Sequence, residues 1–139
     1  MTDTTASTPI LPTEPLNAAA SDPNVLGWMQ GSPPPPEKQV RFDDGSMYTF
    51  PKLRWAKSNI RRLVPTTNVW RGTEPVCVLP RADRDDLDAV TFTPIGRSEP
   101  MTWAQSLDAN YTDGIVVLHR GRIVYERYFG ALDAQRPHI

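Results

Sequence analysis

The 139-residue sequence contains one cysteine, two histidines and no long apolar run. The single cysteine, Cys77, excludes an intramolecular disulfide and a zinc site built on several thiolates. No segment approaches the roughly 20 apolar residues of a membrane-spanning helix, and the N-terminus lacks the basic and apolar regions of a signal peptide. The net charge is only −1, so no global attraction to nucleic acid or to an anionic membrane is expected. We therefore expect a cytoplasmic protein with no nucleic-acid or membrane partner.

Proline, by contrast, is abundant. The chain has 15 prolines, many of them before Lys38, and hydrophobic residues make up 39% of the sequence. A segment poor in apolar groups cannot bury enough surface to offset the entropy of ordering. We expect residues 1–38 to be a Pro/Thr/Ala-rich, mostly disordered segment, with a short helix beginning near Pro23 and an extended connector at Pro33–Pro36. Residues 39–139 should form the folded domain.

Between residues 40 and 64 the sequence predicts a hairpin followed by a helix. Val40–Phe42 and Met47–Phe50 flank Asp44-Gly45, a pair that favours a tight turn between strands. Pro51 is expected to begin a helix that runs to about Val64, with apolar side chains at helical spacing on one face.

The opposite face of that helix, residues 52–62, is basic. It carries Lys52, Arg54, Lys57, Arg61 and Arg62. Such a face is ordinarily solvated, although a row of cations without acidic neighbours also suits contacts with phosphate groups. We favour the solvated face and keep the phosphate contact as the alternative.

The second half of the chain predicts strands around one helix. Short strands are expected over Val76–Leu79 and Val90–Thr93. Thr102 and Gln105 fit a capping box, so a helix should begin at Thr102 and continue to about Tyr111.

A hairpin over residues 113–130 is the most strongly patterned stretch. Ile115–Leu118 is an unbroken apolar run, which suits a strand buried on both faces. Arg120-Gly121 supplies the turn, because glycine accepts the positive φ of short hairpin loops. Residues 122–129 alternate in polarity, as a strand with two unlike faces does, and Gly130 ends the strand.

No complete catalytic set appears in the sequence. No serine is followed three residues later by lysine, and Ser58 is followed by Arg61, which cannot act as a base. His119 and His138 lie at separate places, and the acidic run 83–88 lacks the glycine of a calcium-binding loop. Gly-x-Ser-x-Gly and phosphate-binding loops are also missing. We therefore assign no catalytic, cofactor-binding or metal-ligating residue.

Four stretches nevertheless resemble a known group of enzymes. The capped helix from Thr102 and the hairpin 113–130 resemble the N-terminal region of serine hydrolases of the class C β-lactamase and penicillin-binding-protein superfamily. Phe50–Trp55 and Leu63–Thr66 are similar to the narrower group of 6-aminohexanoate-dimer hydrolases, the nylon-oligomer hydrolases and related esterases.

The resemblance implies an α+β fold, the N-terminal part of a β-lactamase-like domain with antiparallel strands and helices. It also implies an acyl-enzyme mechanism acting on a small amide or ester substrate. In that family the chain after the second strand enters a helix bearing Ser-x-x-Lys, and residues 131–139 resemble the approach to it. We expect the nucleophile beyond Ile139, the present chain to be truncated and inactive alone, and the remainder of the hydrolase domain to be its partner.

A different class of function remains open on the same residues. The chain is alternatively a free-standing binding protein that uses the Pro-rich segment or the basic helix 52–62 as its contact surface.

Overall fold

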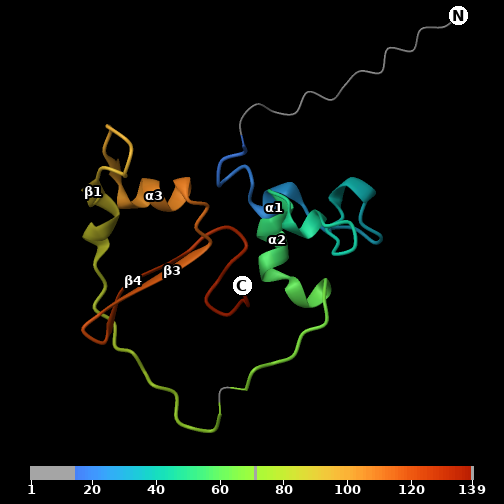
Figure 1. Ribbon diagram of the computed structural model, residues 1–139. Coiled ribbons are helices and arrows are strands. Elements are labelled where there is room, and N and C mark those ends of the chain that lie inside the picture. The colour runs from blue at the N-terminus through green and yellow to red at the C-terminus, as the bar shows by residue number, and fades with distance from the viewer. Residues whose placement is uncertain (1–14, 71, 139) are drawn as a thin grey trace, which may run out of the picture.

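The computed structural model describes residues 15–70 and 72–138, which form two groups of elements joined by an extended segment (Figure 1). The N-terminal group contains α1 (Pro23–Leu26), η1 (Pro36–Lys38), η2 (Ser46–Tyr48), α2 (Lys52–Ser58) and η3 (Ile60–Arg62), where η marks a 3₁₀ turn. The C-terminal group contains η4 (Asp85–Ala89), β1 (Thr91–Phe92), β2 (Met101–Thr102), α3 (Trp103–Ala109), β3 (Gly114–His119) and β4 (Arg122–Tyr128).

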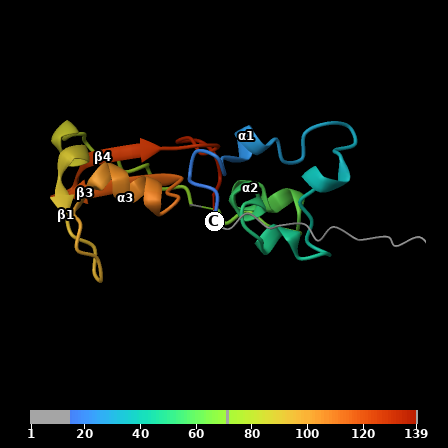
Figure 2. The same ribbon diagram turned by 90° about the horizontal axis from the view of Figure 1, so that it is seen from above.

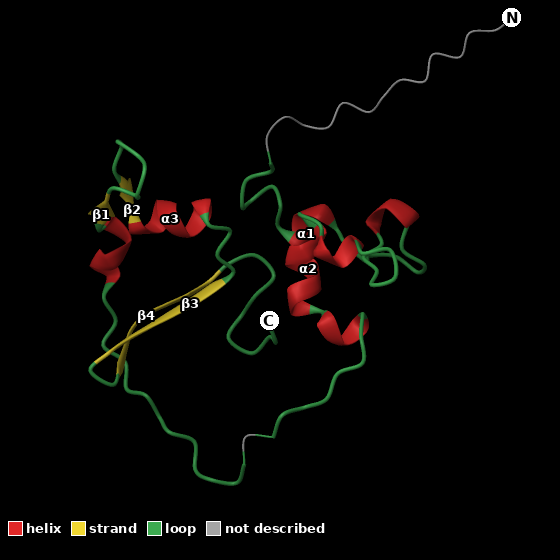
Figure 3. Cartoon of the chain, viewed as in Figure 1, coloured by secondary structure: helices red, strands yellow, loops and turns green. Residues whose placement is uncertain are grey.

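The two groups lie side by side and differ in secondary structure. In the view from above, α1 and α2 are on one side and the strands with α3 are on the other (Figure 2). Every strand of the described residues belongs to the C-terminal group, whereas the N-terminal group is built of helices and turns (Figure 3). The α+β class expected from the sequence is therefore confirmed, as two small antiparallel sheets with three α-helices.

A small apolar core holds the N-terminal group together. Val40, Met47, Trp55 and Ala56 are buried, and Trp28, Met29, Ile60 and Leu63 pack against them. Burial of these side chains is the main stabilising term, because α1 and α2 are too short to be stable helices alone.

Part of the segment that we expected to be mostly disordered has a defined place in this group. Helix α1 begins after Asp22, whose carboxylate accepts a hydrogen bond from the Asn24 amide at 2.7 Å, as predicted for a short helix there. Residues 15–38 bring Trp28 and Met29 to the core. Residues 1–14 lie outside the described residues.

The predicted hairpin at residues 40–50 is wrong. The chain does turn at Asp44-Gly45, but it then enters η2 instead of a second strand. The Asp44 carboxylate accepts from the Ser46 amide at 2.8 Å, and the Ser46 hydroxyl accepts from the Arg41 amide at 2.9 Å. These local side-chain bonds compete with a strand ladder and satisfy the backbone in its place.

The predicted helix at residues 51–64 is only partly confirmed. Helix α2 ends at Ser58, because Asn59 leaves the helical conformation and its side-chain amide donates back to the Trp55 carbonyl at 2.9 Å. The chain continues as η3. The prediction of a wholly solvated basic face is wrong for Arg54, which is buried.

Helix α3 begins as the sequence predicted. The Thr102 hydroxyl accepts from the Gln105 amide at 3.1 Å, and the Gln105 side chain accepts from the Thr102 amide at 2.8 Å, which completes the capping box. The strand expected near residues 90–93 is present as β1, paired antiparallel with β2, which the sequence pattern did not predict.

The hairpin of β3 and β4 is confirmed, with Arg120 and Gly121 both at positive φ in the turn. A bulge between Val117 and Leu118 was not predicted. Burial of β3 on both faces is wrong over the described residues, since Val116 and Leu118 are 48% and 54% exposed. The face that carries Val117 is the better covered one, with Tyr125 fully buried on it.

The strand predicted at Val76–Leu79 is also wrong. These residues are exposed and belong to the extended connection. The following segment, Pro80–Arg84, lies against β4 instead: the Ile123 amide donates to the Pro80 carbonyl at 2.9 Å and the Ala82 amide donates to the Ile123 carbonyl at 2.8 Å. One edge of the hairpin is thereby partly paired.

Thr102→Ala should destabilise the protein by about 1 kcal/mol, because it removes the cap of α3. Urea unfolding followed by circular dichroism measures this change. Thr73→Ala is the matched control, since Thr73 lies exposed in the extended connection. Equal effects of the two substitutions would show that the capping box contributes nothing.

Candidate functional site

The most buried polar cluster joins the two groups of elements through Arg54. This arginine lies in the middle of α2 and is 6% exposed. One guanidinium nitrogen, Nη2, lies 2.6 Å from Oδ1 of Asp113, just before β3. Planar guanidinium groups suit such contacts because their N–H donors form a rigid fork.

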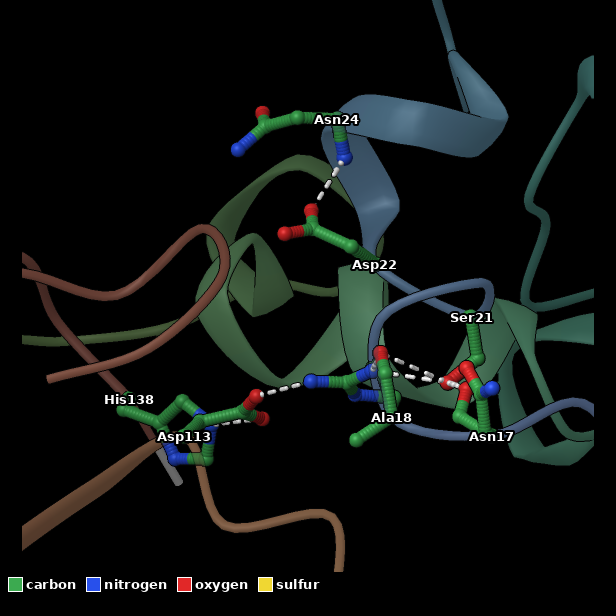
Figure 4. Close-up of polar contacts among 8 residues, drawn as sticks. Asn17, Ala18, Ser21, Asp22, Asn24, Asp113 and His138 are labelled. Atoms are coloured by element: carbon green, nitrogen blue, oxygen red, sulfur yellow. Dashed lines mark hydrogen bonds and ion pairs between the residues drawn. The ribbon is translucent and has the colours of Figure 1, made fainter. Parts of the chain in front are cut away.

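The other terminal nitrogen of Arg54 holds the chain before α1. Nη1 donates to the Ala18 carbonyl at 2.6 Å and to the Ser21 hydroxyl at 2.7 Å. Ser21 is fully buried, and its hydroxyl donates to the Asn17 carbonyl at 2.7 Å. Figure 4 shows Asn17, Ala18 and Ser21 on one side of the cluster and Asp113 on the other.

His138 adds a contact from the C-terminal segment. Its Nε2 lies 3.3 Å from Oδ2 of Asp113, the oxygen that Nη2 of Arg54 does not contact (Figure 4). Asp113 thus receives contacts from residues far apart in the sequence. The sequence placed His119 and His138 apart and gave no sign of the contact between His138 and Asp113. His119 is exposed at the end of β3.

The cluster contains a serine, an aspartate and a histidine, yet their arrangement supplies no activated nucleophile. The Ser21 hydroxyl accepts from Arg54 and donates to the Asn17 carbonyl, and His138 contacts Asp113. Arginine stays protonated and cannot take a proton from the hydroxyl. The arrangement is therefore a structural connection between the two groups.

A second set of charges surrounds the acidic run 83–88. Arg81 contacts Asp83 and Glu126, Arg84 contacts Asp86, and Arg127 lies near Asp85 and Asp88. The hydrogen bonds from Arg81 and Arg84 lower the pKa of Asp83 and of Asp86. Among the described residues, no three His, Cys, Asp or Glu side chains gather closely enough to hold a metal ion.

Tyr125 links this acidic segment to the hairpin. Its ring is buried beside Trp103, and its hydroxyl donates to the Asp88 carboxylate. Burial and that hydrogen bond raise the pKa of Tyr125 above its ordinary value of 10.0.

Cys77 is exposed in the extended connection. No helix in the described part of the chain is long and apolar enough to cross a membrane.

Comparison with solved structures adds a relationship to a hydrolase, in keeping with a partial hydrolase-like fold. The matching structure, from Bacillus anthracis, carries the name of a 6-aminohexanoate-dimer hydrolase; it is 26% identical, with a TM-score of 0.59. The likeness covers 71% of this chain but 26% of that one, so the chain spans about a quarter of its length. The sequence matches no protein-family model and no curated protein.

Asp113→Asn should lower the free energy of unfolding by about 3 kcal/mol or more, because it leaves the Arg54 charge buried without an anion. Urea unfolding measures the effect. Asp86→Asn is the matched control, since it breaks an ion pair whose side chains are 58% and 59% exposed and should change stability little. Similar losses in both variants would contradict a special role for the buried pair.

Proposed function

We propose that this chain is the N-terminal portion of a serine hydrolase domain that cleaves an amide or ester bond through an acyl-enzyme. The observation that carries the proposal is the likeness over 71% of the chain to a structure named as a 6-aminohexanoate-dimer hydrolase. The sequence resemblance of α3 and the hairpin to the lead-in of such enzymes is in keeping with it. A small amide or ester is the substrate of the complete enzyme.

Exposed apolar side chains on β3 support the proposal that further residues of the enzyme cover this strand. Val116 and Leu118 face outward from β3 and are 48% and 54% exposed. A hairpin is marginally stable alone and ordinarily gains further strands or a covering helix. We propose that the remainder of the hydrolase domain covers this face.

The chemistry would then reside outside the present residues. Acyl transfer requires an activated nucleophile, a base and donors for the oxyanion in one place. The 139 residues contain no Ser-x-x-Lys motif, and the buried cluster around Arg54 has no base beside Ser21. The chain alone is therefore proposed to be inactive.

The alternative of a free-standing binding protein is weakened for the basic helix. Arg54, at the centre of its basic face, is committed to Asp113, and the helix breaks at Asn59. Pro33 and Pro35 are exposed, so the Pro-rich segment keeps a surface that an aromatic groove would bind.

The coding sequence beyond Ile139 is expected to continue into a helix bearing Ser-x-x-Lys. The extended protein should hydrolyse p-nitrophenyl acetate and lose that activity when the motif serine becomes alanine. The 139-residue chain should not hydrolyse this ester. The rate of p-nitrophenol release, with and without a serine-directed inhibitor, measures the activity of both proteins. A stop codon followed by unrelated sequence, or inhibitor-sensitive turnover by the 139-residue chain, would overturn the proposal.

The double substitution Val116→Thr with Leu118→Thr should reduce aggregation and dye binding of the 139-residue chain with little loss of stability, because both side chains are about half exposed. In the extended protein the same substitutions should be destabilising. Val117→Thr is the control, since Val117 points to the opposite, half-buried face and should destabilise both forms. If the double substitution changed the stability of the short and the extended proteins equally, this face of β3 would not be covered in the complete enzyme.

A further inference from the structure

A surface groove crosses the C-terminal group where η4 meets the hairpin of β3 and β4. It consists of two hollows, of about 550 Å³ and 230 Å³, whose linings share Leu87 and Val117. Binding clefts for small molecules usually measure about 300 to 1,000 Å³, so the larger hollow alone falls within that range.

A bulge in the hairpin shapes the larger hollow. The register shifts after the pair Val117 and Tyr125, and Val124 is left without an opposite residue on β3. Val124 lines the hollow, and its carbonyl accepts from the Arg84 amide at 2.9 Å, which holds the segment that enters η4 against the hairpin. Bulges of this kind re-aim side chains and are common beside functional sites.

The smaller hollow is the apolar end of the groove. Its described lining consists of the side chains of Leu87, Val90, Trp103 and Val117. Val90 is 48% exposed although it is apolar. An apolar group placed in this hollow would remove such surface from water, which is the main favourable term in the binding of small molecules.

The larger hollow adds positive charge at the tip of the hairpin. Every ionisable residue of its described lining is basic, namely Arg84, His119, Arg120 and Arg122. Arg84 is already paired with Asp86. The side chains of Arg120 and Arg122, in contrast, form no hydrogen bond or ion pair with the described residues. Two guanidinium groups at one end of the groove are therefore available to an anion from outside the chain.

We propose that this groove binds an amphipathic carboxylate, a small molecule with one carboxylate group on an apolar body. The carboxylate pairs with Arg120 and Arg122, whose planar N–H donors match its two oxygens, and the apolar body lies against Trp103 in the smaller hollow. A single negative charge fits best, because the acidic run 83–88 borders the groove and would repel further charge. The site uses no nucleophile and does not rest on the proposed hydrolase function.

The probe is 4-phenylbutanoate, titrated calorimetrically into the 139-residue chain while the Gly121 amide and the Trp103 indole N–H are followed by ¹H–¹⁵N NMR. Butanoate lacks the aromatic body, 4-phenyl-1-butanol lacks the anion, and 4-phenylbutylamine reverses the charge. We expect one saturable site for 4-phenylbutanoate, with shifts of both resonances. Each comparison compound should bind roughly tenfold more weakly or worse.

Arg120→Gln and Arg122→Gln should each weaken the binding of 4-phenylbutanoate roughly fivefold, the effect of losing one exposed charge pair, and leave the binding of the phenyl alcohol unchanged. Both side chains are exposed, so the fold should be unaffected. Arg97→Gln is the matched control, because it removes an equal charge from the exposed loop between β1 and β2, outside both linings. Equal affinities for 4-phenylbutanoate and 4-phenyl-1-butanol, unchanged affinity in either groove variant, a static Trp103 resonance or the lack of saturable binding would overturn the inference.

Discussion

The buried ion pair between Arg54 and Asp113 is the constraint on which the arrangement of this chain depends. It joins α2 to the start of β3 across 59 residues of sequence, and the same guanidinium fixes the chain before α1. A charge that is 94% removed from solvent requires an anion beside it. Because Asp113 also meets His138, the entry to the hairpin and the segment after it converge on one carboxylate.

The two faces of the hairpin that follows this junction differ in burial. Tyr125 is buried against Trp103 and reaches the acidic segment through its hydroxyl, whereas Val116 and Leu118 face outward. Antiparallel sheets commonly leave one face to solvent, but here that face of β3 carries apolar side chains. The likeness to a quarter of a structure named as a hydrolase is consistent with this form.

The buried cluster contains residue types found in catalytic sites, but not in a catalytic arrangement. The buried cluster holds Ser21, Asp113 and His138, but Arg54 stands where a base would have to act. Arg54 thus fixes the fold through its two terminal nitrogens, which hold Asp113 on one side and the chain before α1 on the other.

Features that depend on neighbouring residues could be predicted from the sequence: the capping box of Thr102 and Gln105, the Arg120-Gly121 turn, the pairing of β3 with β4 and the short helix after Asp22. It failed at residues 40–50, where side-chain bonds of Asp44 and Ser46 replaced a ladder, and at Val76–Leu79, which found no strand partner. The burial of Arg54, its pairing with Asp113 and a cavity beside them became visible only in the folded chain. The physical reason is that burial and long-range charge pairing are set by groups distant in sequence, which local patterns do not contain.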